Sequence, residues 1–339
     1  MQKNLFFPDG IGFHSYAAVG GCEEGRGPVG RGFDLIDDTD RFGAGTWEKA
    51  ESEICRLSLN LALKKGKIDA GQISILAAGD LENQCVASAY GLAPFNIPYL
   101  GLYGACSTLT EGLIAVSCHL AAAGGDEGLF GAVVTSSHNA AAERQFRTPL
   151  EYGAQRTPSA QWTATAGGAF LLRPSHGKAR ITAVMPGRIR DGEVTDGANM
   201  GAAMAPAAAD SILSYFEKCG ENPEDYDLIL TGDLGRVGSD LLREILDEKY
   251  AGKKHALSDR HDDCGLNLYD FDLQDVHAGG SGCGCSAAVL AAKFLPAVER
   301  GEIRRMLLLS TGALMSPSSI QQKLPILGIA PLVRIEYRA

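Results

Sequence analysis

The amino-acid sequence predicts an α/β protein made of two similar halves. Two segments read almost alike, 72–81 and 225–234, and both end in Gly-Asp-Leu, so that Asp80 and Asp233 stand 153 positions apart. Strands and helices alternate in the same order around both segments, which is typical of α/β proteins. A unit of about 150 residues is too long for a solenoid repeat and indicates duplicated domains. Chance similarity between apolar strands is the alternative explanation.

The first shared element is a helix that precedes the repeated strand. At the same offset, without a gap, Leu59 and Leu63 fall on Ile212 and Phe216. Apolar residues four positions apart lie on one face of a helix, so both segments predict a helix that packs on one side. The apolar run that follows each helix predicts a short buried strand.

The likeness continues downstream of the repeated strand. In the first half we expect a helix over 108–123 and strands over 131–137 and near 167–173; in the second half, a helix over 287–299 and strands over 305–312 and near 328–337. In such folds ligands bind beyond the carboxyl ends of the strands, at the starts of helices. We therefore expect one central pocket, shared by the turn at Cys106 and its counterpart at 279–286.

The composition is that of an ordinary globular protein. The chain has 339 residues, of which 45% are hydrophobic and 21% charged, enough to bury a core in each half. The formal net charge of −10, without any run of lysine and arginine, argues against nucleic-acid binding. The first residues lack the apolar core of a signal peptide, and no stretch reaches the roughly 18 apolar residues that span a bilayer. We expect a cytoplasmic protein, or one peripheral to a membrane.

The nine cysteines predict free thiols. Their number is odd, and Cys283-Gly284-Cys285 is too close for a two-cysteine zinc motif. The side chains of His261, Asp262 and Asp263 are potential metal ligands, but adjacent residues seldom point at one ion. No cofactor and no metal site are therefore expected.

Cys106 is the first candidate for chemistry. It stands in the turn Gly104-Ala105-Cys106-Ser107, between a predicted strand and a predicted helix. At a helix start the unpaired backbone N–H groups and the macrodipole lower the pKa of a thiol, so we expect a reactive thiolate or a pocket inherited from one. The small neighbours leave room for a ligand. The alternative is a buried cysteine that only packs.

Polar residues near the ends of other strands are the next candidates. His138 follows the strand 131–137, and Arg144 and Arg147 follow it, so that an imidazole and a guanidinium fork are available to grip a carboxylate. His261 is a candidate general base or ligand donor if the chain folds it toward Cys106. A capped loop with solvated arginines is the alternative interpretation of the first group.

The remaining candidates lie in turns. Ser281 belongs to the glycine-rich run 278–286, which either cradles an anion with backbone N–H groups or packs tightly between the halves. Asp80 and Asp233 either cap the following helix or touch a ligand, and Asn83 has the same two readings. Met200 and Met204 are expected to pack rather than to react.

Several of these runs resemble the thiolase superfamily, in particular its ketoacyl synthase III branch. The resemblance rests on the duplicated halves, the Gly-Ala-Cys-Ser turn and the late glycine-rich turn. Further runs are similar to the stage V sporulation protein AD family of spore-forming bacteria, namely 79–81, 135–147, 203–210, 226–234, 261–265 and 310–317. The resemblance covers nearly the whole chain.

This resemblance implies a thiolase-like, five-layered αβαβα sandwich of two half-domains, which we place at residues 1–175 and 176–339. It also implies a binding protein for dipicolinic acid (pyridine-2,6-dicarboxylate), free or as its calcium chelate, needed for its uptake into the developing spore. The expected partners are membrane-embedded proteins of the same sporulation operon at the inner spore membrane, and a homodimer is expected by analogy. The expected ligand-binding residues are Cys106, His138, Arg147, His261, Asn83, Asp80 and Ser281.

The sequence departs from the enzymes of the ketoacyl synthase III branch, which use a Cys-His-Asn set. Cys106 matches the cysteine and His261 the histidine, but Cys264 stands where that branch has an asparagine, and Gly280 falls about where the later catalytic asparagine stands. Loss of an oxyanion donor costs on the order of 10²–10³ in rate. The leading hypothesis is a binding protein with an ancestral acyl pocket. The alternatives are an acyltransferase with Cys106 as nucleophile and His261 as base, and a scaffold for the membrane partners.

Overall fold

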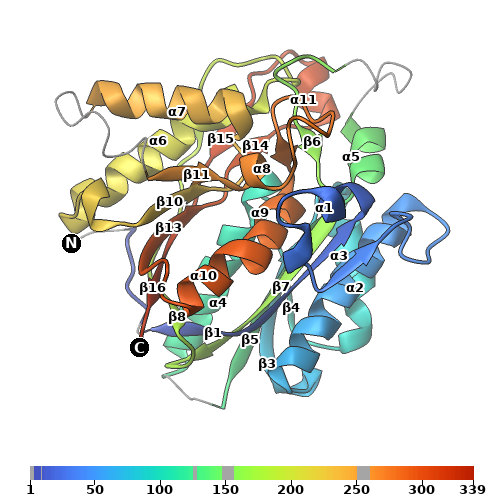
Figure 1. Ribbon diagram of the computed structural model, residues 1–339, viewed down its shortest axis with the longest axis vertical. Coiled ribbons are helices and arrows are strands. Elements are labelled where there is room, and N and C mark those ends of the chain that lie inside the picture. Colours follow the sequence, from blue (N-terminus) through green and yellow to red (C-terminus); the bar gives the residue numbers. More distant parts are fainter. Residues whose placement is uncertain (1–3, 9, 125–127, 147–155, 250–259) are drawn as a thin grey trace.

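The strands of the two halves follow the same order on either side of a central pair (Figure 1). The structure is a computed structural model that describes residues 4–8, 10–124, 128–146, 156–249 and 260–339. The strands described are β1 (Ile11–Gly21), β2 (Leu35–Asp37), β3 (Ile73–Gly79), β4 (Tyr99–Gly101), β5 (Phe130–Ser137), β6 (Trp162–Thr163), β7 (Ala166–Pro174), β8 (Ala179–Met185), β9 (Arg190–Asp191), β10 (Leu228–Thr231), β11 (His261–Asp263), β12 (Gly280–Ser281), β13 (Arg305–Leu309), β14 (Gly312–Leu314), β15 (Leu327–Ile329) and β16 (Leu332–Tyr337).

The helices surround and separate the two half-sheets. Those described are α1 (Cys22–Arg26), α2 (Trp47–Gly66), α3 (Val86–Leu92), α4 (Thr108–Ala122), α5 (Asn139–Phe146), α6 (Met200–Cys219), α7 (Gly235–Lys249), α8 (Cys264–Asn267), α9 (Cys283–Val289), α10 (Leu295–Glu299) and α11 (Pro317–Gln321). The predicted α/β class is confirmed.

Outward from the centre, the first half runs β1-β7-β5-β3-β4 and the second β8-β16-β13-β10-β11. In each half the two inner pairs are antiparallel and the two outer pairs are parallel. The halves meet where β1 pairs with β8, at Ile11 with Ile181 and Gly12 with Arg180. The topology of one half is therefore repeated by the other.

The helices before the repeated strands show the duplication in the chain itself. α2 and α6 begin at Trp47 and Met200 and end at Gly66 and Cys219, so both ends keep the offset read from the sequence. The expected boundary after residue 175 lies between β7 and β8, and it stays a prediction.

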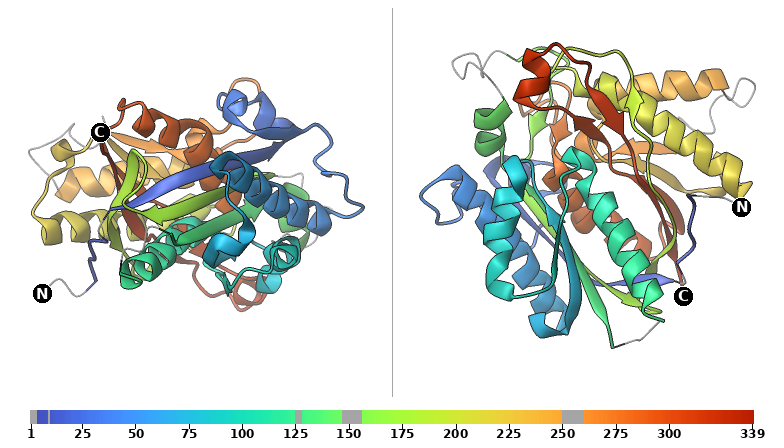
Figure 2. Two further views of the ribbon diagram at one scale, coloured as in Figure 1. Left: turned by 90° about the horizontal axis from the view of Figure 1, so that it is seen from below. Right: turned by 180° about the vertical axis from the view of Figure 1, so that it is seen from behind.

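Alternating strand residues divide the interior into three cores and five layers (Figure 2). In β5, Ala132 and Val134 face the core with α2, whereas Val133 faces the central core of α4 and α9. In β13, Leu308 faces that central core and Leu307 faces the core with α6. The layers are therefore α2 with α3, the first half-sheet, α4 with α9 and α10, the second half-sheet, and α6 with α7.

The central layer explains the apolar composition of α4. The stretch Ala105–Ala122 is long and apolar enough to cross a membrane by length and composition alone, which the sequence analysis missed. More than half of it, 56%, is buried in the protein. Its apolar residues face two half-sheets, as those of a core helix do.

The helix predicted over 287–299 is wrong in detail. Helix α9 begins four residues earlier, at Cys283, and a π-helical turn at Leu290–Phe294 separates it from α10. Pro296 has no N–H to donate to the preceding turn, and the wider turn before it accommodates this loss.

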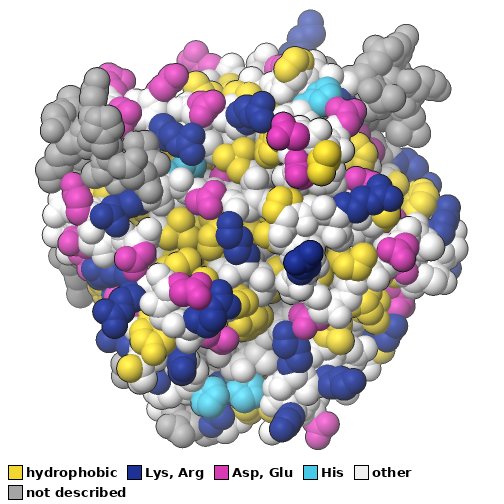
Figure 3. All heavy atoms as spheres, in the orientation of Figure 1, with side chains coloured by type: hydrophobic (Ala, Val, Ile, Leu, Met, Phe, Trp, Pro, Cys, Tyr) yellow, Lys and Arg dark blue, Asp and Glu magenta, His cyan; other side chains and the backbone are white. Residues whose placement is uncertain are grey.

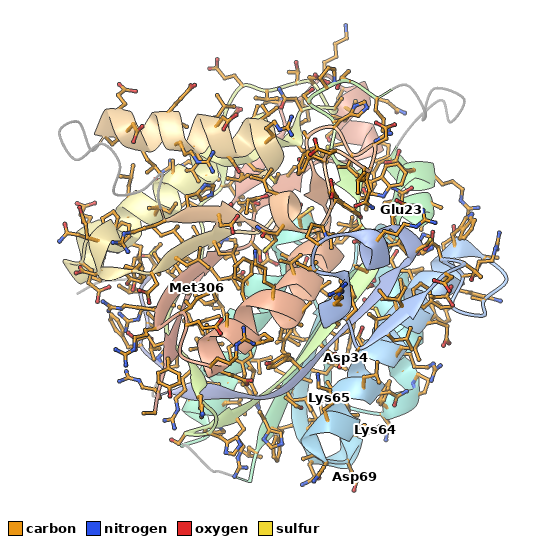
Figure 4. All side chains as sticks on the ribbon, viewed as in Figure 1. Glu23, Asp34, Lys64, Lys65, Asp69 and Met306 are labelled. Carbon is orange, nitrogen blue, oxygen red and sulfur yellow. The ribbon has the colours of Figure 1, made fainter. Side chains whose placement is uncertain are left out.

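The surface carries charges of both signs. Lysine and arginine side chains alternate with acidic ones on the face shown in Figure 3. Lys65 near the end of α2 pairs with Asp34 at 2.9 Å, and the two side chains lie together in Figure 4. Exposed pairs of this kind contribute about 0–1 kcal/mol each.

The first half ends in an uncharged edge. All three residues of the edge strand β4 are exposed, and no charged residue occurs between Glu82 and Glu111. Exposed apolar side chains gather there, among them Tyr90 at 75% and Leu100 at 41%. Unpaired strand edges with apolar side chains favour pairing with another chain.

We expect the homodimer to form through this edge. Leu100→Lys places a charge on β4 and should shift the molar mass in size-exclusion chromatography with light scattering from dimer to monomer. Leu273→Lys, at a more exposed leucine elsewhere, is the control and should leave the mass unchanged. A dimer that persists in the Leu100 variant would place the interface elsewhere.

Candidate functional site

A cavity of about 560 Å³ lies between the two halves, beside the start of α4. Helices α5 and α11, which flank it, lie near each other at the top of Figure 1. One wall comes from the first half and the other from the second, and the lining includes the buried side chains of Cys106, Ser281 and Gln161. We call first-half wall the five lining residues Leu81, Tyr103, Ala142, Glu143 and Phe146; the second-half wall includes Gly197, Ala198, Met200, Leu314, Met315, Ser316, Ser319 and Ile320.

Cys106 lies in a 3₁₀ turn, Ala105–Ser107, that leads directly into α4. The turn is fixed by Ser107, whose hydroxyl donates to the Gly104 carbonyl at 2.6 Å and contacts the Glu111 carboxyl at 2.6 Å. A Cβ at Gly104 would lie 2.1 Å from the Glu111 carboxylate, so a larger residue there would displace this side chain. The sequence Gly-Ala-Cys-Ser thus builds a tight turn that presents the thiol to the cavity.

The partner of the thiol is a carboxylate of the second half. The Cys106 thiol lies 3.7 Å from the Ser281 hydroxyl, and the negative charge of the Asp233 carboxylate acts on it. Asp233 is fully buried and accepts from the Ser281 hydroxyl, the Gly282 N–H and the Thr311 hydroxyl at 3.0, 3.0 and 2.9 Å. The glycine-rich turn therefore binds an anion of the chain itself.

The electrostatics of Cys106 contradict the expected reactive thiolate. Burial, and then the neighbouring Asp233 carboxylate, raise the pKa of the thiol well above its ordinary value. Both effects disfavour the charged form and outweigh the helix start. Burial also raises the pKa of Asp233, while its hydrogen bonds oppose that rise. Cys106 is thus a neutral thiol at physiological pH.

The structure does not bring His261 to Cys106. Its ring contacts the Thr231 hydroxyl at 2.9 Å, and that hydroxyl donates to Asp263 at 2.6 Å. Burial lowers the pKa of His261 to about 3, so the ring is neutral. His261 is not among the residues that line the cavity, and a role as base toward Cys106 is not supported by this geometry.

His138 also lies apart from the central cavity. Its Nε2 donates to the Asp40 carbonyl at 2.8 Å, the ring lies 5.2 Å from that of Trp47, and burial lowers its pKa. It lines a separate hollow of about 70 Å³ together with Glu24 and Trp162. Arg147 lies outside the described residues, and Arg144 pairs with Glu48 on α2.

Of the turn residues, Ser281 lines the cavity, whereas Asp80 and Asn83 stand behind or beside the first-half wall. Asp80 accepts from the Ser88 N–H and hydroxyl at 2.7 and 2.6 Å, so it caps the following turn. Asn83 is exposed and accepts from the Tyr103 hydroxyl at 3.4 Å. Asp80 and Asp233 occupy equivalent positions in the two halves, but Asp80 caps a helical turn whereas Asp233 lies beside Cys106.

The cavity is lined mainly by apolar side chains. Among its described lining residues, Glu143 is the one with a charged side chain. Within the same described part of the chain, no group of three or more His, Cys, Asp and Glu side chains could hold a metal ion, and all nine cysteines are free thiols. The expected free thiols are confirmed.

The sequence analysis named Asp233, which lies behind the cavity, because it shares the repeated Gly-Asp-Leu with Asp80. It missed several residues that line the cavity. Gln161, which donates to the Asp233 and Gly280 carbonyls at 2.7 and 2.8 Å, carried no sequence signal, since it precedes a two-residue strand. Met200 lines the cavity, whereas Met204 is buried in the core, as predicted for packing.

The neutral state of Cys106 can be tested by alkylation. In the folded protein at pH 8, iodoacetamide should modify the exposed Cys118 and leave Cys106 intact, as peptide mass spectrometry will show. Asp233→Asn removes the negative charge beside the thiol and should speed the modification of Cys106, by about tenfold for each unit by which its pKa falls. Equal rates at both cysteines in the unsubstituted protein would contradict this account.

The comparisons with known proteins agree with this architecture. OleA from Xanthomonas campestris with cerulenin bound is 13% identical, with a TM-score of 0.58 over 97% of this chain and 98% of that one. The same protein with lauric acid and lauroyl-CoA is 11% identical, with a TM-score of 0.60 over 97% and 100%. These likenesses confirm the expected thiolase-like fold.

The family follows from the sequence matches. Residues 2–336 match the family described as stage V sporulation protein AD. The protein of that name from Bacillus subtilis (strain 168) is 42% identical over 329 residues, which cover 97% of this chain and 95% of that protein. The chain therefore belongs to the stage V sporulation protein AD family.

Proposed function

We propose that this chain binds pyridine-2,6-dicarboxylate, free or as its calcium chelate, in the central cavity, as a step of its uptake into the developing spore. The observation that carries the proposal is the state of Cys106. The chain has a cavity at this turn, but the thiol there is neutral and lies beside the Asp233 carboxylate instead of an imidazole. A cavity without an activated nucleophile is suited to binding rather than to catalysis.

The cavity suits a small planar ligand with polar edges. Tyr103 and Phe146 offer aromatic surface on one wall, and the hydroxyls of Thr163 and Ser316 are available to carboxylate oxygens. A 1:1 calcium chelate of the dianion is neutral, so it avoids burying net charge beside Glu143. The membrane-embedded partners, the place at the inner spore membrane and the role of Arg147 stay predictions.

Calorimetric titration tests this proposal directly. Dipicolinate, with and without Ca²⁺, should give saturable heat, and Ala142→Phe should weaken binding at least tenfold, about 1.4 kcal/mol, because it fills the cavity. Ala121→Phe, at an exposed position of α4, is the matched control and should bind as the unsubstituted protein does. No heat at millimolar ligand in either condition would refute the proposal.

Acyl transfer is the second candidate, and one contact favours it. The Asp233 carboxylate is close enough to Cys106 to raise the pKa of the thiol, so it is available to accept the proton as sulfur attacks a thioester. The attack would form an acyl-cysteine and release the thiol of the donor. OleA, whose structures include one with lauric acid and lauroyl-CoA, shares the fold.

Mass spectrometry separates the two candidates. Incubation with lauroyl-CoA should leave the peptide that contains Cys106 unmodified if the chain only binds, whereas acyl transfer would add the mass of one lauroyl group. Cys106→Ser, which is unable to form the thioester, is the control for adducts elsewhere. A lauroyl adduct on Cys106 that disappears with Asp233→Asn would favour the enzyme.

A further inference from the structure

Two buried glutamates lie behind the first-half wall of the cavity, and no step above uses them. Glu51 on α2 is 0% exposed, and Glu82, after β3, is 4% exposed. Their carboxyl groups are hydrogen-bonded to each other. Glu51 Oε2 and Glu82 Oε1 have no other hydrogen-bond partner.

This contact requires a proton. Two ionised carboxylates only accept hydrogen bonds, so a bond between them exists when one carries a hydrogen. Burial, followed by the charges of Asp80 and Glu82, raises the pKa of Glu51 well above its ordinary value. Burial and Asp80 raise the pKa of Glu82 to about 7, and the bond from Glu51 opposes this. The pair therefore keeps a shared proton at mildly acidic pH, where ordinary glutamates are ionised.

Among the residues that the structure describes, no cation contributes to the pKa shifts of the pair. Asp80, the third acid, accepts hydrogen bonds from Ser88 and the Glu82 N–H. The charge of Glu51 acts on the thiols of Cys55, Cys85 and Cys283, while the arginines of α2 and α5 are paired elsewhere, Arg56 with Glu53 and Arg144 with Glu48. Since the basic side chain of α5 is paired with Glu48, loss of the shared proton leaves two adjacent carboxylates uncompensated.

The turn that carries Glu82 also holds the cavity wall. Leu81 lines the cavity, and its carbonyl accepts from Gln145 of α5 at 2.8 Å and from the Tyr103 hydroxyl at 3.4 Å. Gln145 in turn accepts from the Asn83 N–H at 2.9 Å. All five described residues of the first-half wall are thus on this turn or on segments bonded to it.

The backbone of the turn depends on these contacts. Gln84 and Cys85 both have φ of 56°, in the left-handed region that is unfavourable for residues with a side chain. Such a conformation persists where surrounding contacts hold it. The Glu51–Glu82 bond is one of the contacts that join the turn to α2.

We propose that the proton shared by Glu51 and Glu82 fixes the first-half wall, so that the cavity holds its ligand at mildly acidic pH and releases it as the pair ionises. The effect on the ligand rests on the function proposed above; the effect on the turn does not. Because the folded chain binds this proton more tightly than the unfolded chain, the pair stabilises folding less as pH rises above the ordinary glutamate range.

Glu51→Gln tests the proposal, because the amide still donates a hydrogen bond but has no proton to lose. Urea unfolding between pH 5.5 and 8.5 measures how the unfolding constant rises with pH. In Glu51→Gln this rise should be smaller than in the unsubstituted protein, by up to about tenfold per pH unit, the effect of one proton. Dipicolinate affinity should fall with pH in the unsubstituted protein and fall less in this variant.

Glu24→Gln is the matched control. Glu24 is equally buried, and burial raises its pKa to about 7, but it lines the separate small hollow near His138. This variant should also flatten the pH dependence of unfolding, yet keep the pH dependence of dipicolinate affinity.

Three outcomes would overturn the proposal or part of it. An unchanged unfolding slope in Glu51→Gln would exclude the shared proton, and a changed slope with an unchanged affinity profile would exclude its effect on the ligand. If dipicolinate binds neither the unsubstituted protein nor the variants, the proposed function fails. Amide hydrogen exchange of the peptide 80–85 then still tests whether the shared proton fixes the turn. After correction for intrinsic rates, exchange should become faster with pH in the unsubstituted protein and not in Glu51→Gln. The same pH dependence in both proteins would refute the coupling of the turn to the shared proton.

Discussion

The buried Asp233 carboxylate joins more of this structure than any other group at the cavity. Its hydrogen bonds reach the segment after β13 through Thr311 and the glycine-rich turn through Ser281 and Gly282, and its charge acts on the Cys106 thiol at the start of α4. These segments belong to both halves, so this carboxylate lies where the two halves meet at the deep end of the cavity. A buried carboxylate is tolerated when several donors satisfy it, and here three do.

The same carboxylate decides the chemistry of the thiol. In the sequence Cys106 stands at a helix start, where local rules predict a low pKa. In the folded chain it is buried against a negative charge, and desolvation with repulsion prevails over the helix start. A cysteine retained at this place of a thiolase-like fold is thus compatible with the binding role proposed here. The reactivity of the thiol depends on its burial and on the Asp233 carboxylate rather than on the turn that carries it.

Local features of the sequence were enough to predict the fold, and to predict that Cys106 and Ser281 lie at the cavity. The duplication was readable because apolar stripes and strand ends are local features, and α2 and α6 keep the predicted offset to the residue. The side toward which a strand residue faces is not local: His261 turns to Thr231, and His138 to the Asp40 carbonyl. Gln161 and Met315 reach the cavity from segments without a periodic signal, and only tertiary structure shows them.

The duplication also has a consequence for how the two walls differ. At the repeat offset Glu51 corresponds to Met204, and Glu82 to Gly235, so the second half carries no acid pair at the equivalent place. Met204 is fully buried in an apolar core, and Gly235 packs against the Ala278 carbonyl. At these two positions the first half is therefore ionisable and the second half is not. The pH response proposed for the Glu51–Glu82 pair acts on the α5 side of the cavity, and the α11 side has no equivalent pair.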